Sequence, residues 1–209
     1  MKKLAPVLNN EQGFILPFLL VAIVTLCMIS AYTISQVQTV TAGLDIQKAL
    51  EIACKSAASQ VVTDSQANGH PRINPDTAHV MFKRQLALNM GLDINTWNVL
   101  AGSQLSKTPS YVFVVYNGDS TYTNSATWYS FDGINLTVSV QALNGLPRTF
   151  AIDSNNITES DTGGTYLVTL QTPGVVAVIN GQLVNISGND NTSMTRWASS
   201  VLVCTNGGC

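Results

Sequence analysis

The chain contains an unusually long stretch without charge. No charged side chain occurs from Gln12 to Leu44, and the first half of that stretch is almost entirely apolar. A helix needs roughly 20 apolar residues to cross the ~30 Å hydrocarbon core of a bilayer. Residues 14–34 supply that length, and Pro17 would fall in the first turn, where a missing N–H breaks no internal bond. The pattern predicts a leader over residues 1–13 and a transmembrane helix over residues 14–34.

The helical pattern continues beyond the apolar stretch. No proline occurs in residues 35–66, and Gly43 is the weak point. Apolar side chains recur there at helical spacing, at Ile46, Leu50, Ala53, Cys54, Ala57 and Val61. We therefore expect one helix over residues 14–63, with residues 35–66 forming an amphipathic continuation that packs on the rest of the chain.

A second, shorter helix is predicted after the break at residues 68–71. It would begin at Asn74, with Pro75 in its first position, and end at Gly91. Its apolar face would consist of Ala78, Met81, Phe82, Leu86 and Met90. The helix would lie at the start of the globular part, residues 67–209.

Short β-type segments separated by turns follow from residue 111 onward. The predicted strands are Tyr111–Tyr116, Trp128–Phe131, Asn135–Ala142, Tyr166–Leu170, Val175–Ile179 and Ala198–Val203. Asn180-Gly181 is expected to form the turn of a hairpin, because both residues tolerate positive φ. The predicted fold class is α+β: a long N-terminal helix, a short helix and a β-rich globular head with an antiparallel sheet.

The two lysines at the N-terminus predict the orientation in the membrane. Lys2 and Lys3 favour a cytoplasmic N-terminus. The chain would then be a single-pass membrane protein in contact with lipid, with its head extracytoplasmic at the cell surface. The alternative is a cleaved secretory signal with residues 14–29 as its apolar region. Ile29 disfavours it, because a cleavage site after Ser30-Ala31 needs a small side chain at that position.

The amino-acid composition limits the classes of binding partner that we expect. The net charge is −2 and no basic stripe is present, which excludes nucleic acid as an expected partner. The second half is rich in Ser, Thr and Asn and poor in charge, as is common in extracellular β-rich domains. No phosphate loop, dinucleotide fingerprint or zinc-ligand spacing occurs, so no cofactor is expected.

The four cysteines fall into two groups. Cys27 is expected to be a small buried apolar residue of the first helix, and Cys54 follows further along it. Cys204 and Cys209 enclose a short loop with two glycines, and in an oxidising compartment they would form a disulfide. Free thiols and a metal site are the alternatives there, although a metal needs more ligands than this pair supplies.

Candidate catalytic and metal-binding residues are few. Asp161-Thr162-Gly163-Gly164 resembles an aspartic protease turn, but such enzymes need two carboxylates, so we expect a hairpin turn. His70 and His79 are expected at the surface or its boundary, outside any triad. An acidic loop provides candidate Ca²⁺ ligands without an EF-hand spacing, at Asp153, Glu159 and Asp161. We expect neither enzymatic activity nor a metal.

Three features of the N-terminal third carry a family resemblance. They are the Lys2-Lys3 head, Glu11-Gln12-Gly13 directly before the apolar stretch, and the Ala-rich segment from Gln47 to Ala58. Together they resemble bacterial pilin-like or pseudopilin-like subunits, namely TadE/TadG-like proteins of Tad (Flp) pilus systems and PilX-like minor pilins.

The resemblance implies a site and partners. A prepilin peptidase would cut between Gly13 and Phe14, and other pilin-like subunits would pack against the N-terminal helix. The loop closed by Cys204 and Cys209 is similar to the disulfide-closed end of many type IV pilins. Phe18 stands where most processed pilins carry Glu, which favours a minor or initiating subunit or an unprocessed TadG-like protein.

Two functional hypotheses of different classes follow. The first is a non-enzymatic structural or minor subunit of a bacterial pilus or type II secretion-like assembly. The alternative is a membrane-tethered, adhesion-type binding module that uses loops such as Gly145–Pro147 or Asp153–Gly164. A third hypothesis, a secreted hydrolase, has little support because no catalytic constellation stands out in the sequence.

Overall fold

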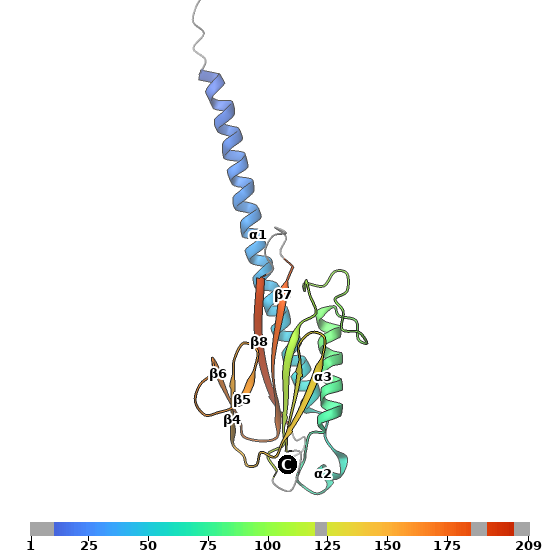
Figure 1. The fold of residues 1–209 in the computed structure, drawn as a ribbon. Coiled ribbons are helices and arrows are strands. Elements are labelled where there is room, and N and C mark those ends of the chain that lie inside the picture. Colours follow the sequence, from blue (N-terminus) through green and yellow to red (C-terminus); the bar gives the residue numbers. More distant parts are fainter. Residues whose placement is uncertain (1–10, 120–124, 185–191, 203–209) are drawn as a thin grey trace, which may run out of the picture.

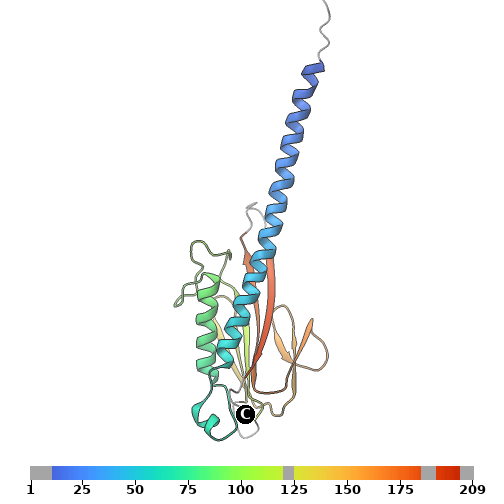
Figure 2. The same ribbon diagram turned by 180° about the vertical axis from the view of Figure 1, so that it is seen from behind.

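One long helix projects from a compact α+β head. The computed structural model describes residues 11–119, 125–184 and 192–202, with the backbone alone for residues 11–16. Helix α1, Glu11–Ala58, extends far beyond the head with its N-terminal half and lies along the head with its C-terminal half (Figure 1). Helices α2, Thr63–Ala67, and α3, Pro75–Met90, follow it, and α3 lies beside α1 (Figure 2). The predicted α+β class is confirmed.

Two antiparallel sheets complete the head. The larger has the order β3-β2-β1-β7-β8 and consists of Leu136–Gln141, Ala126–Phe131, Ser110–Tyr116, Gly174–Leu183 and Thr192–Val201. The smaller has the order β5-β4-β6 and consists of Ile157–Glu159, Arg148–Ile152 and Tyr166–Leu170. Strand β3 is an edge strand, and every one of its residues is exposed.

The larger sheet is the middle layer of three. Tyr111, Phe113 and Val115 of β1 belong to the core shared with α1 and α3. The alternate residues Val112, Val114 and Tyr116 belong to a second core shared with the smaller sheet. Burial on both faces explains why β1 is a continuous apolar segment rather than an alternating one.

The second half of α1 packs on the head, as its periodicity predicts. Its buried residues face α3, β7 and β8, and most are small, which lets the backbones approach closely. They are Ala42, Ile46, Ala49, Leu50, Ala53, Cys54, Ala57 and Ala58.

The predicted continuation over residues 35–66 is too long. Helix α1 ends at Ala58, and Thr63–Ala67 forms the separate helix α2. Between them Val61 forms a β-bridge with Ile73, and the Val62 N–H donates to the Arg72 carbonyl over 2.9 Å. Both contacts require Val61 and Val62 to have an extended backbone. Valine is β-branched, and β-branched side chains favour the extended conformation over the helix.

Helix α3 has the predicted bounds. The Asn74 side chain accepts hydrogen bonds from the backbone N–H groups of Asp76 and Thr77, at 3.1 and 3.2 Å. Gly91 ends the helix in the left-handed conformation, with φ of 68°. On the apolar face Met81 is only half-buried, and His79 is buried instead.

The predicted hairpin at Asn180-Gly181 is wrong. Both residues lie inside β7, which runs from Gly174 to Leu183, and they pair with Thr195 and Met194 of β8. A Cβ on Gly181 would lie 2.8 Å from Leu105 Cδ2, so the glycine permits a close side-chain contact rather than a turn.

The smaller sheet corrects two further expectations. Strands β4 and β5 were not predicted from the sequence. Asp161–Gly164 lies between β5 and β6, which flank β4 on opposite sides, so this segment connects two strands that are not hydrogen-bonded to each other. A hairpin turn was therefore the wrong interpretation.

Candidate functional site

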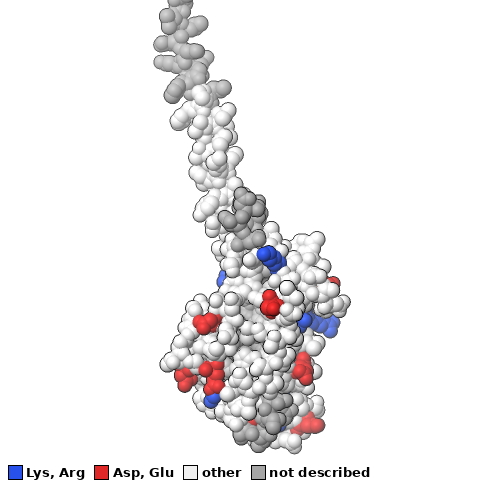
Figure 3. Space-filling view, viewed as in Figure 1, with Lys and Arg blue, Asp and Glu red and all other residues white. Residues whose placement is uncertain are grey.

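The exposed half of α1 is the most distinctive surface of the molecule. Every residue from Pro17 to Ile34 is exposed, and none carries charge. In the described part of the chain, α1 is the one helix long and apolar enough to cross a membrane. At 1.5 Å per residue, residues 14–34 span about 30 Å, the thickness of a bilayer core. Figure 3 shows this half of the helix free of Lys, Arg, Asp and Glu, in contrast to the head.

The two threonine side chains in this half bond to the helix's own backbone. The Thr25 hydroxyl donates to the Val21 carbonyl over 2.8 Å, and the Thr33 hydroxyl donates to the Ser30 carbonyl over 2.9 Å. Such bonds allow hydroxyls to enter hydrocarbon at little cost. Tyr32 is exposed at the end nearest the head, where aromatic side chains concentrate in membrane helices.

The predicted cleavage site lies inside the helix. Because α1 begins at Glu11, Gly13 and Phe14 have helical backbones, and Pro17 is the seventh residue of the helix rather than part of its first turn. Proline has no N–H, so the carbonyl four residues earlier, that of Gly13, lacks its helical hydrogen bond. The helix is therefore weakened next to the Gly13–Phe14 bond.

Gly43 marks the place where α1 meets the head. The Arg196 side chain of β8 donates from Nε to the Gly43 carbonyl over 3.2 Å. A Cβ at Gly43 would lie 2.5 Å from Arg196 Nη2, so only glycine allows this approach without displacing the guanidinium. The Gln47 carboxamide adds a bond to the Trp197 carbonyl at 3.1 Å. These contacts join the helix to the edge of β8.

The cysteines differ from the sequence-based expectation. Cys27 is exposed on α1, so its predicted burial is wrong within a single chain. Cys54 is fully buried, and burial together with the charge of Glu51 raises the pKa of its thiol far above the usual range, which keeps it protonated. Both are free thiols. Cys204 and Cys209, the predicted disulfide, lie outside the described residues.

His79 lies inside the head, although the sequence predicts a surface or boundary position. Its ring stacks on Tyr129 with centroids 4.0 Å apart, and its Nε2 lies 2.7 Å from the Tyr111 hydroxyl. Burial is the main reason that the pKa of His79 is lowered to about 4. The positive charge of Lys83 also lowers this pKa, whereas the negative charge of Asp76 raises it. The neutral imidazole is a structural link between α3 and the sheet.

The acidic loop does not form a metal site. Asp153 accepts a hydrogen bond from the Thr165 N–H at 3.1 Å, and Glu159 forms an ion pair with Arg148. Among the described residues, no group of three His, Cys, Asp or Glu side chains could hold a metal ion. The three carboxylates predicted as Ca²⁺ ligands are therefore not brought together.

A hollow lies at the end of the head opposite the exposed half of α1. It has a volume of about 530 Å³, and His70 and Leu146 contribute to its lining. Leu146 belongs to one of the loops that the sequence proposes for ligand binding. Loops from four parts of the chain meet there.

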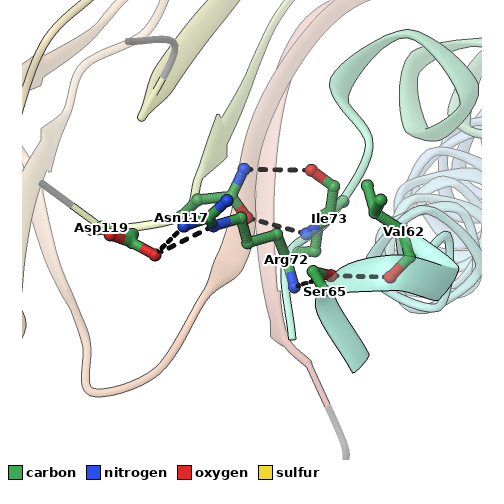
Figure 4. A network of polar contacts seen from close by, with 6 residues as sticks. All are labelled: Val62, Ser65, Arg72, Ile73, Asn117 and Asp119. Carbon is green, nitrogen blue, oxygen red and sulfur yellow. Dashed lines mark hydrogen bonds and ion pairs between the residues drawn. The ribbon is translucent and has the colours of Figure 1, made fainter. Parts of the chain in front are cut away.

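Polar contacts hold these loops together (Figure 4). Arg72 forms an ion pair with Asp119, and its backbone N–H donates to the Ser65 hydroxyl over 2.9 Å. The Asn117 side chain accepts from the Ile73 N–H at 2.8 Å and donates to the Ile73 carbonyl at 3.0 Å. These bonds fix the segment around α2 against the end of β1.

Comparisons with known proteins identify no family for this chain. No protein-family model matches the chain, and no curated protein or solved structure matches it significantly. The arrangement itself defines a class: a candidate single-pass membrane helix that continues without a break into an α+β head.

Proposed function

We propose that the chain is a non-enzymatic structural or minor subunit of a bacterial pilus or type II secretion-like assembly of the Tad (Flp) kind. The observation that carries this proposal is the two-part helix α1. From Pro17 to Ile34 it is uncharged and exposed on all sides, and its second half is docked into the core of the head. This division suits a helix that joins like helices while carrying a folded head.

The exposed apolar half of α1 must be covered by lipid or by other protein. Monomeric soluble proteins rarely expose apolar patches above a few hundred Å². A bilayer covers this surface before assembly, and neighbouring pilin-like helices cover it afterwards through packing and polar contacts. With Lys2 and Lys3 in the cytoplasm, the head lies outside it, at the cell surface.

The alternative, a membrane-tethered binding module, is favoured by a different observation. The hollow is lined by loops, which lie at the end of the head far from the exposed half of α1 (Figure 1). Co-purification with other pilin-like subunits would support the assembly proposal. A head that stays monomeric and binds one ligand saturably would support the module.

Cysteine cross-linking in native membranes tests helix association. Cys27→Ser, Cys204→Ser and Cys209→Ser leave the buried Cys54 as the remaining thiol, and one cysteine is then placed in turn at 26, 27, 28 and 29, each of which is exposed. Four successive residues cover the full circumference of a helix. We expect a disulfide-linked species at one or two of these positions, because packed helices present a fixed face to each other.

The control is the same background with no cysteine added, and it should yield no such species. Equal yields at all four positions would indicate random collision in the bilayer. Either that result or a complete lack of cross-linking would contradict helix-mediated assembly.

The mature N-terminus tests the proposed processing. We expect intact-mass spectrometry of the membrane fraction to find a chain beginning at Phe14. Pro17→Ala should lower the processed fraction, since its N–H can bond to the Gly13 carbonyl and stabilise helix at the scissile bond. A chain that retains Met1 would instead indicate a permanently anchored, TadG-like protein. A start after Ala31 would indicate a secretory signal and refute both membrane proposals.

A further inference from the structure

A second hollow lies between β8 and the smaller sheet, beside the point where α1 joins the head. Its volume is about 250 Å³, below the roughly 300–1,000 Å³ of pockets for drug-sized ligands. Four separate parts of the chain contribute to it, through Gln47, Asp153, Ser154, Tyr166, Arg196 and Trp197. Gln47 and Arg196 also join α1 to β8, so the variants that test this hollow are made at Asp153 and Tyr166 instead. We call this hollow the lateral cleft.

Two aromatic rings form one wall of the lateral cleft. The rings of Tyr166 and Trp197 lie with centroids 5.5 Å apart and planes inclined by 35°. Tyr166 is 50% exposed, and Trp197 is half-buried against the core beneath it. The other two tryptophans, Trp97 and Trp128, are buried. An aromatic surface of this kind offers π-faces to the C–H groups of a small ring.

Polar groups around this wall are held in place by the protein. The Arg196 guanidinium donates to the carbonyls of Gly43 and Thr195, at 3.2 and 2.9 Å. Asp153 Oδ1 accepts from the Thr165 N–H. Within the described part of the chain, Asp153 Oδ2 and the Trp197 indole N–H have no hydrogen-bond partner. One acceptor and one donor are thus available to a ligand.

The charge of the lateral cleft limits the class of ligand. Asp153 and Arg196 provide one negative and one positive side chain, so the cleft favours neither a phosphate nor an ammonium group. One acceptor and one donor beside an aromatic wall suit a neutral ring that carries hydroxyls. We propose that the lateral cleft binds a neutral hexopyranose. This inference does not depend on the proposed assembly function.

Tryptophan fluorescence provides the test. Trp197 is the tryptophan with ready access to solvent, so a sugar that covers it should shift the emission to shorter wavelength. The full chain is kept in a zwitterionic detergent, because a sugar-headed detergent would compete for the cleft. Glucose, galactose, mannose and N-acetylglucosamine are titrated separately, and we expect a saturable shift in the millimolar range with at least one of them.

The source of the sugar is resolved by two further titrations. One uses a soluble oligosaccharide of the sugar that binds, and the other uses phospholipid vesicles that contain a glycolipid with the same headgroup. Tighter binding to the oligosaccharide identifies a polysaccharide ligand, and tighter binding to the vesicles identifies a membrane glycolipid. Either outcome supports the proposed sugar class.

Variants locate the binding in the lateral cleft. Tyr166→Ala removes part of the aromatic wall, and Asp153→Asn replaces the available acceptor by a donor. Each should weaken binding about tenfold, the loss typical of one good contact. Leu167→Ala is the matched control, because Leu167 follows Tyr166 on β6, is 52% exposed and does not line the cleft. The affinity of the Leu167→Ala variant for the sugar should stay within about a factor of two of the affinity of the original chain.

Two results would overturn the proposal. The first is no saturable shift with any of the four sugars at tens of millimolar. The second is unchanged affinity in both Tyr166→Ala and Asp153→Asn, with thermal melts confirming that these variants are folded. A negative result here would leave the cross-linking test of assembly unaffected.

Discussion

A chain shortened to begin at Ser35 is expected to fold into a head that is soluble without detergent. The residues from Pro17 to Ile34 are all exposed, whereas the buried residues of α1 begin at Ala42. The shortened chain therefore keeps the whole core and loses only the surface that requires lipid. Sedimentation velocity in plain buffer, together with a cooperative thermal transition, would verify this.

The matched control begins at Ser59 and lacks all of α1. It removes Leu50, Ala53 and Cys54, each of which is fully buried between α3 and the sheet. Loss of one buried leucine side chain alone typically costs about 2–5 kcal/mol, a large part of the stability of a domain. We expect this chain to have no cooperative transition. Equal melting temperatures for the two chains, or precipitation of the Ser35 chain, would contradict the structure.

Acid is expected to destabilise the head through His79. Its pKa is lowered from 6.5 to about 4 in the folded protein, so below pH 6.5 the unfolded state binds a proton that the folded state does not. The stabilisation is complete above pH 6.5 and is lost progressively as the pH falls toward 4. At about 1.4 kcal/mol for each pH unit, the loss is on the order of 3 kcal/mol.

Urea unfolding at several pH values between 7 and 4 would measure this loss. His79→Phe keeps an aromatic ring on Tyr129 but cannot take up a proton, so its stability should be less sensitive to acid over this range. Exposed carboxylates such as Asp93 and Asp132 also titrate. They are present in both the original chain and the His79→Phe variant, so their effect on stability cancels when the two are compared. Identical pH profiles would show that His79 is not the cause.

Local signals in the sequence predict some elements accurately. Helix α3 begins and ends where predicted because the Asn74 side chain caps its first turn, Pro75 fits that turn, and Gly91 adopts the left-handed conformation. Strand β6 has the predicted bounds of Tyr166–Leu170. The docking side of α1 follows from its helical spacing. In each case the information lies within a few residues of the element itself.

Elements determined by distant contacts are predicted poorly. Asn180-Gly181 has the composition of a turn, but pairing with β8 and contact with Leu105 hold it extended. The burial of His79 depends on Tyr111 and Tyr129, which come from two strands far along the chain. The lateral cleft likewise joins Gln47 to residues more than a hundred positions away, with no local motif to reveal it.

Strand β3 is an open edge without the usual protection. It contains no charge and no proline, and Leu136, Val138 and Val140 are 44, 51 and 49% exposed. Soluble proteins shield such edges with charged or bulged strands, because open edges recruit other strands. Because β3 runs away from the exposed half of α1, an antiparallel β3 from a second copy would have to be inverted, with its own α1 pointing the opposite way (Figure 1).

Two copies with their helices in the same bilayer are both upright, so their β3 edges cannot pair in this way. In the proposed membrane arrangement, α1 therefore prevents antiparallel pairing between the β3 strands of two copies. The β3 edge stays accessible to antiparallel strands from other proteins. A head released from its helix is free to invert, so two such heads can pair through β3 as a soluble dimer.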